Sequence, residues 1–221
     1  MIRELFRLAG EITDLLLPRK CPRPPTKTTF KALVASVIPP APDLAGRRNS
    51  PAAGGAAAAH LDEYHIWLLD HYVSLNIMGK DFPLRLANAT AQMLDTAAGQ
   101  LAAPQKADPE KADRPGPFAA LSPADRCRTI TLLEQLQIDL ASLPVPFRRN
   151  PGIVLAMISI LNMLTTIGYY SEWSGYGSTR LEPAAKRKLE HFPAGWQQVG
   201  YPGPAKGYHA LRGYLIKDFA E

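Results

Sequence analysis

The stretch of sequence that decides the fold is PGIVLAMISILNMLTTIGYY, from Pro151 to Tyr170. Proline suits the first position of a helix, and no charged residue occurs anywhere in this stretch. A helix that is apolar on all sides is either the surrounded centre of a helical core or a membrane span, for which about 20 residues suffice. The core helix is favoured by scattered polar or small residues: Ser159, Asn162, Thr165, Thr166 and Gly168. A single membrane span over residues 153–167 stays open as the alternative.

More helices are predicted before this segment, because apolar residues recur there at spacings of three and four. The last of these helices has a clear beginning. Ser122 is a natural N-cap, Pro123 fits the first helical position, and Asp125 places negative charge where the helix dipole favours it. The expected helices cover residues 27–38, 60–80, 83–98 and 122–141.

The resulting prediction is an all-α fold, since no run of useful length alternates with the period of a strand. A compact helical body covers residues 27–170 and is interrupted by proline-rich loops at 39–59 and 100–122. Residues 1–20 form a separate element, an amphipathic helix that ends at Pro18. Charges throughout that helix argue against a signal peptide, so it is expected to pack on the body, with a membrane surface or a partner as the alternative.

The C-terminal residues 171–221 have a different composition, dense in Gly, Pro, Trp and Tyr. Glycine and proline specify a loop path, and aromatic rings supply a large contact area with few rotatable bonds. Disordered tails avoid aromatic residues, so we expect a long irregular arm that lies against another surface. The residues predicted to bind a partner are Trp173, Tyr176, Trp196, Tyr201, Pro202, Tyr208, His209 and Tyr214.

The order of residues in this arm also carries a family resemblance. Gly-Tyr-Tyr-Ser at 168–171 follows an apolar helix, and Gly-Trp-Gln-Gln-Val-Gly-Tyr-Pro-Gly-Pro occupies residues 195–204. This pattern resembles the gluconate 2-dehydrogenase subunit 3 family over roughly residues 120–215. Members of that family are small accessory subunits of membrane-associated, flavin-dependent sugar and polyol dehydrogenases.

The resemblance implies a non-catalytic subunit of an oxidoreductase complex. Its partner would be a large catalytic subunit of the glucose-methanol-choline type that holds FAD, and a cytochrome often takes the electrons in such complexes. It implies no catalytic residue on this chain. Two other classes stay open, a single-span membrane anchor for a partner and a stand-alone helical protein-interaction module.

The sequence contains no recognisable cofactor-binding or metal-binding motif that would indicate a catalytic reaction on this chain. Gly175-Tyr176-Gly177 lacks a third glycine at the spacing of a nucleotide-binding loop, and the haem attachment motif is absent. Asp62 and His65 share a helix face, but no second such pair completes a di-iron site, so a surface or cap-like pair is expected. Cys21 and Cys127 show no metal-ligand spacing, and whether they pair is open. We therefore expect no catalytic, cofactor or metal site.

The charge of the chain is mildly basic, at +5. This value suits solubility, an acidic partner or an anionic membrane surface, and it lacks the Lys/Arg stripe of a nucleic-acid protein. Lys186-Arg187-Lys188 is expected to be a solvated face, with docking to an acidic surface as the alternative. Neither Arg47-Arg48 nor Arg148-Arg149 resembles the twin-arginine leader that many relatives carry. The expected location is the cytoplasm, or export only as the passenger of a signal-bearing partner.

Overall fold

The computed structural model of the 221-residue chain describes residues 24–41, 54–73, 75–77, 80–82, 86–102 and 116–203. Several sequence predictions concern residues outside these ranges. They are the helix at 2–17, the pairing of Cys21, Arg47-Arg48, and the partner-binding residues Tyr208, His209 and Tyr214.

The described residues are predominantly helical, which confirms the predicted all-α class. The α-helices are α2 (Pro24–Val37), α3 (Gly55–Ala58), α4 (Leu61–His71), α5 (Leu86–Ala102), α6 (Pro117–Ala120), α7 (Pro123–Glu134), α8 (Pro151–Tyr170) and α9 (Ala194–Val199). Short 3₁₀ helices are η3 (Leu140–Ser142), η4 (Trp173–Thr179) and η5 (Ala184–Lys186). One small antiparallel hairpin joins β1 (Leu75–Ile77) to β2 (Lys80–Phe82).

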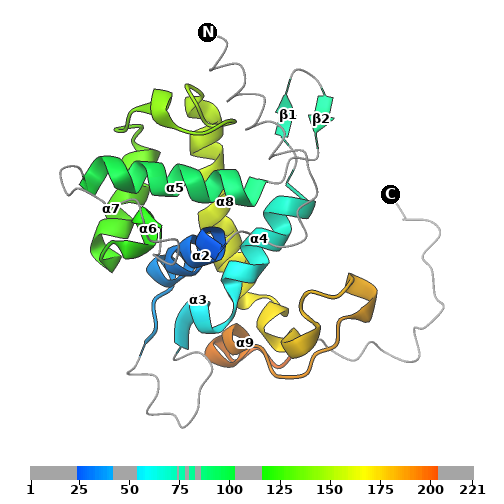
Figure 1. Cartoon of the computed structure of the whole chain (residues 1–221). Helices are drawn as coiled ribbons and strands as arrows, with labels where there is room; N and C mark the ends of the chain where they lie inside the picture. Colours follow the sequence, from blue (N-terminus) through cyan, green and yellow to red (C-terminus); the bar gives the residue numbers. More distant parts are fainter. Residues whose placement is uncertain are drawn as a thin grey trace, which may run out of the picture.

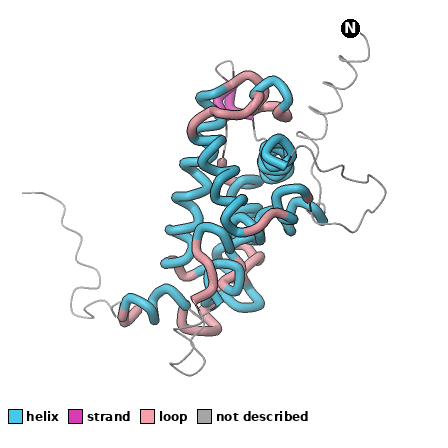
Figure 2. Tube along the Cα trace, turned by 90° about the vertical axis from the view of Figure 1, so that its left-hand side faces the viewer, coloured by secondary structure: helices cyan, strands magenta, loops and turns pink. Residues whose placement is uncertain are grey.

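Helix α2 lies at the centre of the body, in contact with α4, α5, α6, α7 and α8 (Figure 1). The hairpin projects at one end of the body, and α9 and the segments around it lie at the opposite end. Figure 2 shows the same arrangement turned by 90°, with the hairpin again at the upper end. From here on, "the arm" means residues 171–203, which follow α8 and pack against α4 and α8.

Helix α8 is a core helix, as its sequence predicts. Its buried side consists of Val154, Met157, Ile158, Leu161, Leu164, Thr165, Gly168 and Tyr169. Most of the apolar ones belong to a continuous cluster with the facing residues of α2, α4, α5 and α7. Among the described helices, α8 is long and apolar enough to cross a membrane, and 44% of its apolar window is buried inside the body.

The prediction that α8 is surrounded on all sides is wrong, because one face of it is exposed. Leu155, Met163, Ile167 and Tyr170 are between 39% and 51% exposed. They recur at helical spacing, so they form one stripe along the helix. The helix therefore divides its apolar residues between the core and an open surface.

The helix predicted over residues 60–80 is wrong at its C-terminal end. Helix α4 stops at His71, where the N–H groups of Tyr72 and Val73 both donate to the Leu68 carbonyl, at 2.8 and 3.1 Å. The chain then enters the hairpin, in which Leu75 pairs with Phe82 and Ile77 with Lys80. Apolar spacing alone cannot distinguish a short strand from another helical turn.

Both predicted loops turn out to contain helix. Within residues 39–59, α3 brings Ala56 into a buried cluster. Within residues 100–122, α5 continues to Ala102, and α6 inserts Phe118 fully into the core. The Asp95 carboxylate accepts from the Phe118 N–H at 3.1 Å, which satisfies an N–H group at the beginning of α6 that has no acceptor within the helix.

Helix α7 begins as predicted and ends early. Its N-cap is Ser122, whose hydroxyl oxygen accepts from the Asp125 N–H at 3.2 Å. It ends at Glu134 rather than near Ala141, because Leu136 adopts a left-handed conformation with φ of 54°. The residues that follow turn back toward α5 through η3.

Candidate functional site

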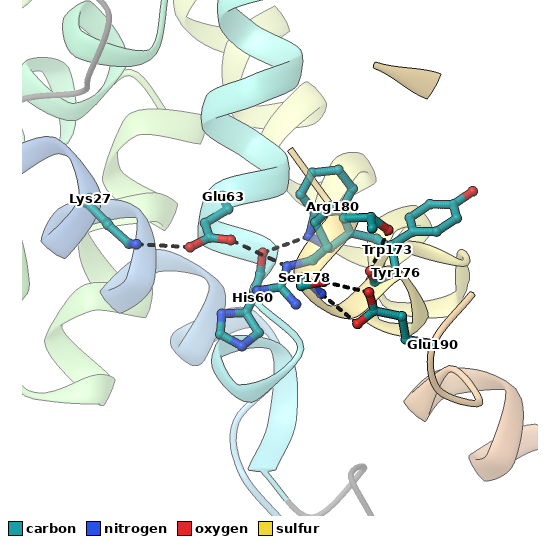
Figure 3. Close-up of polar contacts among 9 residues, drawn as sticks. Lys27, His60, Glu63, Trp173, Tyr176, Ser178, Arg180 and Glu190 are labelled. Atoms are coloured by element: carbon teal, nitrogen blue, oxygen red, sulfur yellow. Dashed lines mark hydrogen bonds and ion pairs between the residues drawn. The ribbon is translucent and has the colours of Figure 1, made fainter. Parts of the chain in front are cut away.

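The arm packs onto the body where the beginning of α4 meets the end of α8, and two tryptophans fix it there. Trp173 is 2% exposed, and its indole N–H donates to the His60 carbonyl at 2.9 Å (Figure 3). Trp196 is 7% exposed, and its indole N–H donates to the Tyr170 carbonyl at 2.9 Å. Each buried ring thus satisfies its polar atom on a backbone carbonyl of the body. In this structure both rings pack against the body.

Two glycines of the aromatic motifs allow this close packing. A Cβ atom on Gly168 would lie 2.6 Å from the Tyr64 ring. A Cβ atom on Gly195 would lie 2.2 Å from the Tyr169 carbonyl oxygen, which is backbone and cannot move aside freely. Both glycines therefore have a packing role within this chain, Gly168 where α8 meets α4 and Gly195 where α9 meets α8.

A polar bridge also connects the arm to the body (Figure 3). The Glu63 carboxylate accepts from Lys27 of α2 at 2.9 Å and from Arg180 of the arm at 3.4 Å. Burial alone would raise the pKa of Glu63, but the hydrogen bond and charge of Lys27, with the charge of Arg180, lower it. Within the arm, the Glu190 carboxylate accepts from the N–H and the hydroxyl of Ser178 at 2.8 and 2.6 Å.

Arg187 occupies an unexpected position against the body. The Lys186-Arg187-Lys188 segment was expected to be a solvated face, but its central side chain is half-buried over aromatic rings. Its guanidinium carbon lies 4.2 Å from the centre of the Trp67 ring. The rings of Trp173 and Tyr176 lie 5.4 and 5.8 Å away. Such contacts are favourable cation–π interactions, so Arg187 belongs to the packing of the arm.

A cavity of about 330 Å³ opens at this junction. Most of its wall is aromatic, and it holds one acidic and one basic side chain. It is lined by Tyr64, Tyr170, Ser171, Glu172, Trp173, Tyr176, Arg187 and Trp196. The Tyr176 hydroxyl donates to Glu172 at 2.5 Å, and this hydrogen bond, together with burial, raises the pKa of Tyr176.

The exposed predicted residues lie beside Trp196. The Tyr201 and Phe192 rings both contact the Trp196 ring edge-on, with ring centres 4.9 and 5.8 Å from its centre. Tyr201, Pro202 and Phe192 are exposed to solvent. Because the Trp196 indole N–H donates to the Tyr170 carbonyl, Tyr201 and Phe192 lie near the Tyr170 end of the exposed stripe of α8. The described part of the predicted set is thus brought together around one end of α8.

Asp62 and His65 do not form the expected surface or cap-like pair, since both are buried. The two His65 ring nitrogens contact the carbonyls of Leu61 and Leu161 at 2.7 and 3.1 Å, and Thr165 lies 3.1 Å from Nε2. Burial lowers the pKa of His65 and raises that of Asp62. Among the residues that the structure describes, no group of three acidic, His or Cys side chains could hold a metal ion.

Sequence reasoning missed Glu63, Arg180 and Arg187, which join segments far apart in the chain. No local spacing relates Glu63 to Arg180, so no sequence signal pointed to that pair. The sequence showed that the arm is rich in aromatic residues, but it did not show that several of these rings surround Arg187. Comparisons of the chain with protein-family models, with curated proteins and with solved structures found no match.

Proposed function

We propose that this chain is a non-catalytic accessory subunit that docks onto the FAD-containing catalytic subunit of a sugar- or polyol-type oxidoreductase. The observation that carries the proposal is an exposed apolar surface, which we call the α8–α9 face. It consists of Leu155, Met163, Ile167, Tyr170, Phe192 and Tyr201. Contiguous exposed apolar surface of this kind is typical of interaction sites on folded proteins.

The chemistry of the face suits a protein partner. Helix α8 contributes no charged residue to it, and aromatic side chains lie at its arm end. Depletion of charge at the centre and enrichment in aromatic residues are typical of interface cores. A few such residues normally carry most of the binding free energy.

The rigidity of the face supports the same proposal. Trp173, Trp196 and Glu63 fix the arm on the body before any partner arrives. A surface that is ordered in advance loses less conformational entropy on binding. The buried tryptophans would therefore contribute indirectly, by holding Phe192 and Tyr201 in place.

The nature of the partner rests on the sequence resemblance over residues 120–215, to which the comparisons add nothing. The packing of α8 favours docking over the alternative of a single-span anchor. A span would have to withdraw Val154, Met157 and Leu161 from the core, where each is almost fully buried. Exposing each such side chain to lipid would break its packing with the other helices.

The test is co-expression with a large FAD-binding catalytic subunit of the glucose-methanol-choline type, chosen from a gene next to that of this chain where one is found, followed by affinity purification of this chain. The double variant Met163→Lys/Ile167→Lys places two charges on the α8–α9 face, and we expect it to reduce recovery of the flavoprotein at least tenfold. The matched control is Tyr72→Lys, at an exposed aromatic residue beyond the end of α4. Full recovery with the double variant, or loss of recovery with the control, would contradict the proposed face.

A second measurement tests the accessory assignment itself. The chain purified alone is expected to show no flavin or haem absorbance, because its sequence lacks the glycine-rich loop and the haem attachment motif. Stoichiometric absorbance from either group would overturn the assignment. Deletion of residues 204–221 in the co-expression experiment shows whether the predicted Tyr208, His209 and Tyr214 contribute to binding.

A further inference from the structure

The cavity beneath the arm has unused polar groups set among aromatic rings. Arg187 and Glu172 both line it. In the part of the chain that the structure describes, neither side chain has a charged partner within ion-pair distance. The rest of the wall is largely the rings of Tyr64, Trp173 and Trp196. Small-molecule sites share this composition, an apolar and aromatic surface with few convergent polar groups.

Arg187 is held in a fixed position and keeps spare hydrogen-bond donors. Its Nε–H donates to the Glu182 carbonyl at 2.9 Å, and its guanidinium carbon lies over the Trp67 ring. Neither terminal nitrogen has an acceptor among the described residues, and Nη2 is buried. A guanidinium whose position is set in this way offers a fixed positive charge at the wall of the cavity, which suits a carboxylate.

Glu172 favours a ligand that carries a hydrogen-bond donor. One of its carboxylate oxygens accepts from the Tyr176 hydroxyl at 2.5 Å, and the other has no donor among the described residues. An anion without a hydrogen-bond donor would be repelled by the negative charge of the Glu172 carboxylate. An occupant with a hydroxyl or ammonium group beside its carboxylate would instead satisfy both Arg187 and Glu172.

We propose that this cavity binds a small-molecule carboxylate that carries an apolar body and a hydroxyl or amino group next to the carboxylate. Arg187 receives the carboxylate, Glu172 accepts from the neighbouring group, and the rings of Tyr64, Trp173 and Trp196 cover the apolar body. The volume of about 330 Å³ lies at the small end of the range for ligand sites, about 300–1,000 Å³, which favours a compact ligand over a peptide.

This site does not depend on the proposed docking function. It belongs to the chain alone, so its test needs no catalytic subunit. Tyr170 belongs to both sites, but Arg187 and Glu172 lie outside the α8–α9 face and Met163 and Ile167 lie outside the cavity wall, so the two sets of variants can fail independently.

The experiment measures intrinsic tryptophan fluorescence of the full chain, because all three tryptophans lie in or beside the site. Three probes share one phenyl body. They are 3-phenyllactate, 3-phenylpropanoate without the hydroxyl, and 3-phenyl-1,2-propanediol without the carboxylate. We expect saturable quenching by phenyllactate and binding at least about tenfold weaker for each of the other two, the cost of losing one charge-assisted hydrogen bond.

Variants connect the binding to the named residues. Arg187→Lys keeps a positive charge but loses the Nε–H bond to the Glu182 carbonyl that fixes the side chain, and we expect it to weaken phenyllactate binding about tenfold or more. Glu172→Gln should reduce the preference for phenyllactate over phenylpropanoate. The matched control is Lys188→Met, which removes the neighbouring exposed charge and should leave all three affinities unchanged. Amide hydrogen exchange of η4 in each variant verifies that the arm remains packed.

The proposal is overturned if the diol binds as well as phenyllactate, or if Arg187→Lys and Lys188→Met have equal effects. If the arm no longer packs in Arg187→Lys, the test rests on Glu172→Gln. An unchanged preference of Glu172→Gln for phenyllactate over phenylpropanoate would also overturn the proposal. A peptide ending in a free phenylalanine carboxylate provides the last comparison. Tighter binding of that peptide than of phenyllactate would show that the site takes a protein terminus, against the small-molecule proposal.

Discussion

The helical body and the arm are stabilised in different ways. The body buries a continuous cluster of mostly aliphatic residues drawn chiefly from α2, α4, α5, α7 and α8. The arm relies on a few large rings and individual polar bonds, chiefly Trp173, Trp196, Arg187 and the bridge through Glu63. Stability is thus spread over many contacts in the body and concentrated in few contacts in the arm.

This difference predicts how each region responds to change. Apolar burial contributes in proportion to area, so a truncation in the body weakens the whole cooperative unit. A region held by few anchors can open by itself, at a free energy below that of global unfolding. Mutations in the arm should therefore loosen it locally while the body stays folded.

The largest expected effect is in the body. Leu94→Ala removes a side chain that is fully buried between helices, and we expect it to lower the free energy of unfolding by about 2–5 kcal/mol. The matched change in the arm is Leu189→Ala, at a side chain 47% exposed, with an expected effect within about 0.5 kcal/mol. Urea unfolding followed by circular dichroism measures both. Equal effects would show that stability is shared evenly by the two regions.

The next effect tests the close contact between α8 and α9. Gly195→Ala places a Cβ atom against the Tyr169 carbonyl, and overpacking of this kind costs about 1–3 kcal/mol. We expect faster amide hydrogen exchange in α9 with little change in α2 and α5. Gly99→Ala is the control, because its new Cβ meets nothing within 4 Å and alanine favours the helix. Unchanged exchange in α9 would contradict the proposed role of Gly195.

A smaller effect is expected at the beginning of α7, within the body. Ser122→Ala removes the N-cap hydrogen bond to Asp125 and should lower the free energy of unfolding by about 1 kcal/mol. Ser122→Thr retains a hydroxyl acceptor and serves as the control. The measurement is again urea unfolding. A cost equal to that of Leu94→Ala would mean that the cap matters beyond its local bond.

The smallest effect concerns the bridge through Glu63. Its lowered pKa means that the carboxylate stabilises the folded state above its ordinary pKa, near 4.5, and that this contribution is lost as pH falls through the lower folded value. We expect Glu63→Gln to weaken arm protection by less than about 1 kcal/mol at pH 7, since partly exposed ion pairs contribute little. Hydrogen exchange of η4 measures this protection. The wild-type protein and Glu63→Gln should converge in acid, and divergence there would contradict the ionic bridge.

The body was largely predictable because helical periodicity and capping are local properties. The spacing of apolar residues located α2, α5, α7 and α8, and Ser122-Pro123 located the beginning of α7 to the residue. The errors occurred where local spacing is ambiguous. The hairpin after His71 and the burial of Phe118 both depend on pairing or packing with distant segments.

For the candidate site, the sequence predicted which residue types are present but not how their side chains pack. Sequence reasoning identified the aromatic arm, and it included Trp173 and Trp196 among residues that contact a partner. The structure shows both rings buried against the carbonyls of His60 and Tyr170, and their contact with a partner stays a prediction. The direction in which an aromatic side chain packs depends on which backbone groups lie within reach, and that depends on the whole fold.

The sequence by itself determined the helical class, the core position of α8 and the aromatic, glycine-rich character of the arm. These follow from periodicity, capping and composition, which act over a few residues. Only the tertiary structure decided that one face of α8 stays open, that Glu63 joins Lys27 to Arg180, and that Arg187 lies over Trp67. The physical reason is that these contacts join residues up to more than a hundred positions apart, as Glu63 and Arg180 are. Their formation depends on the packing of helices between them.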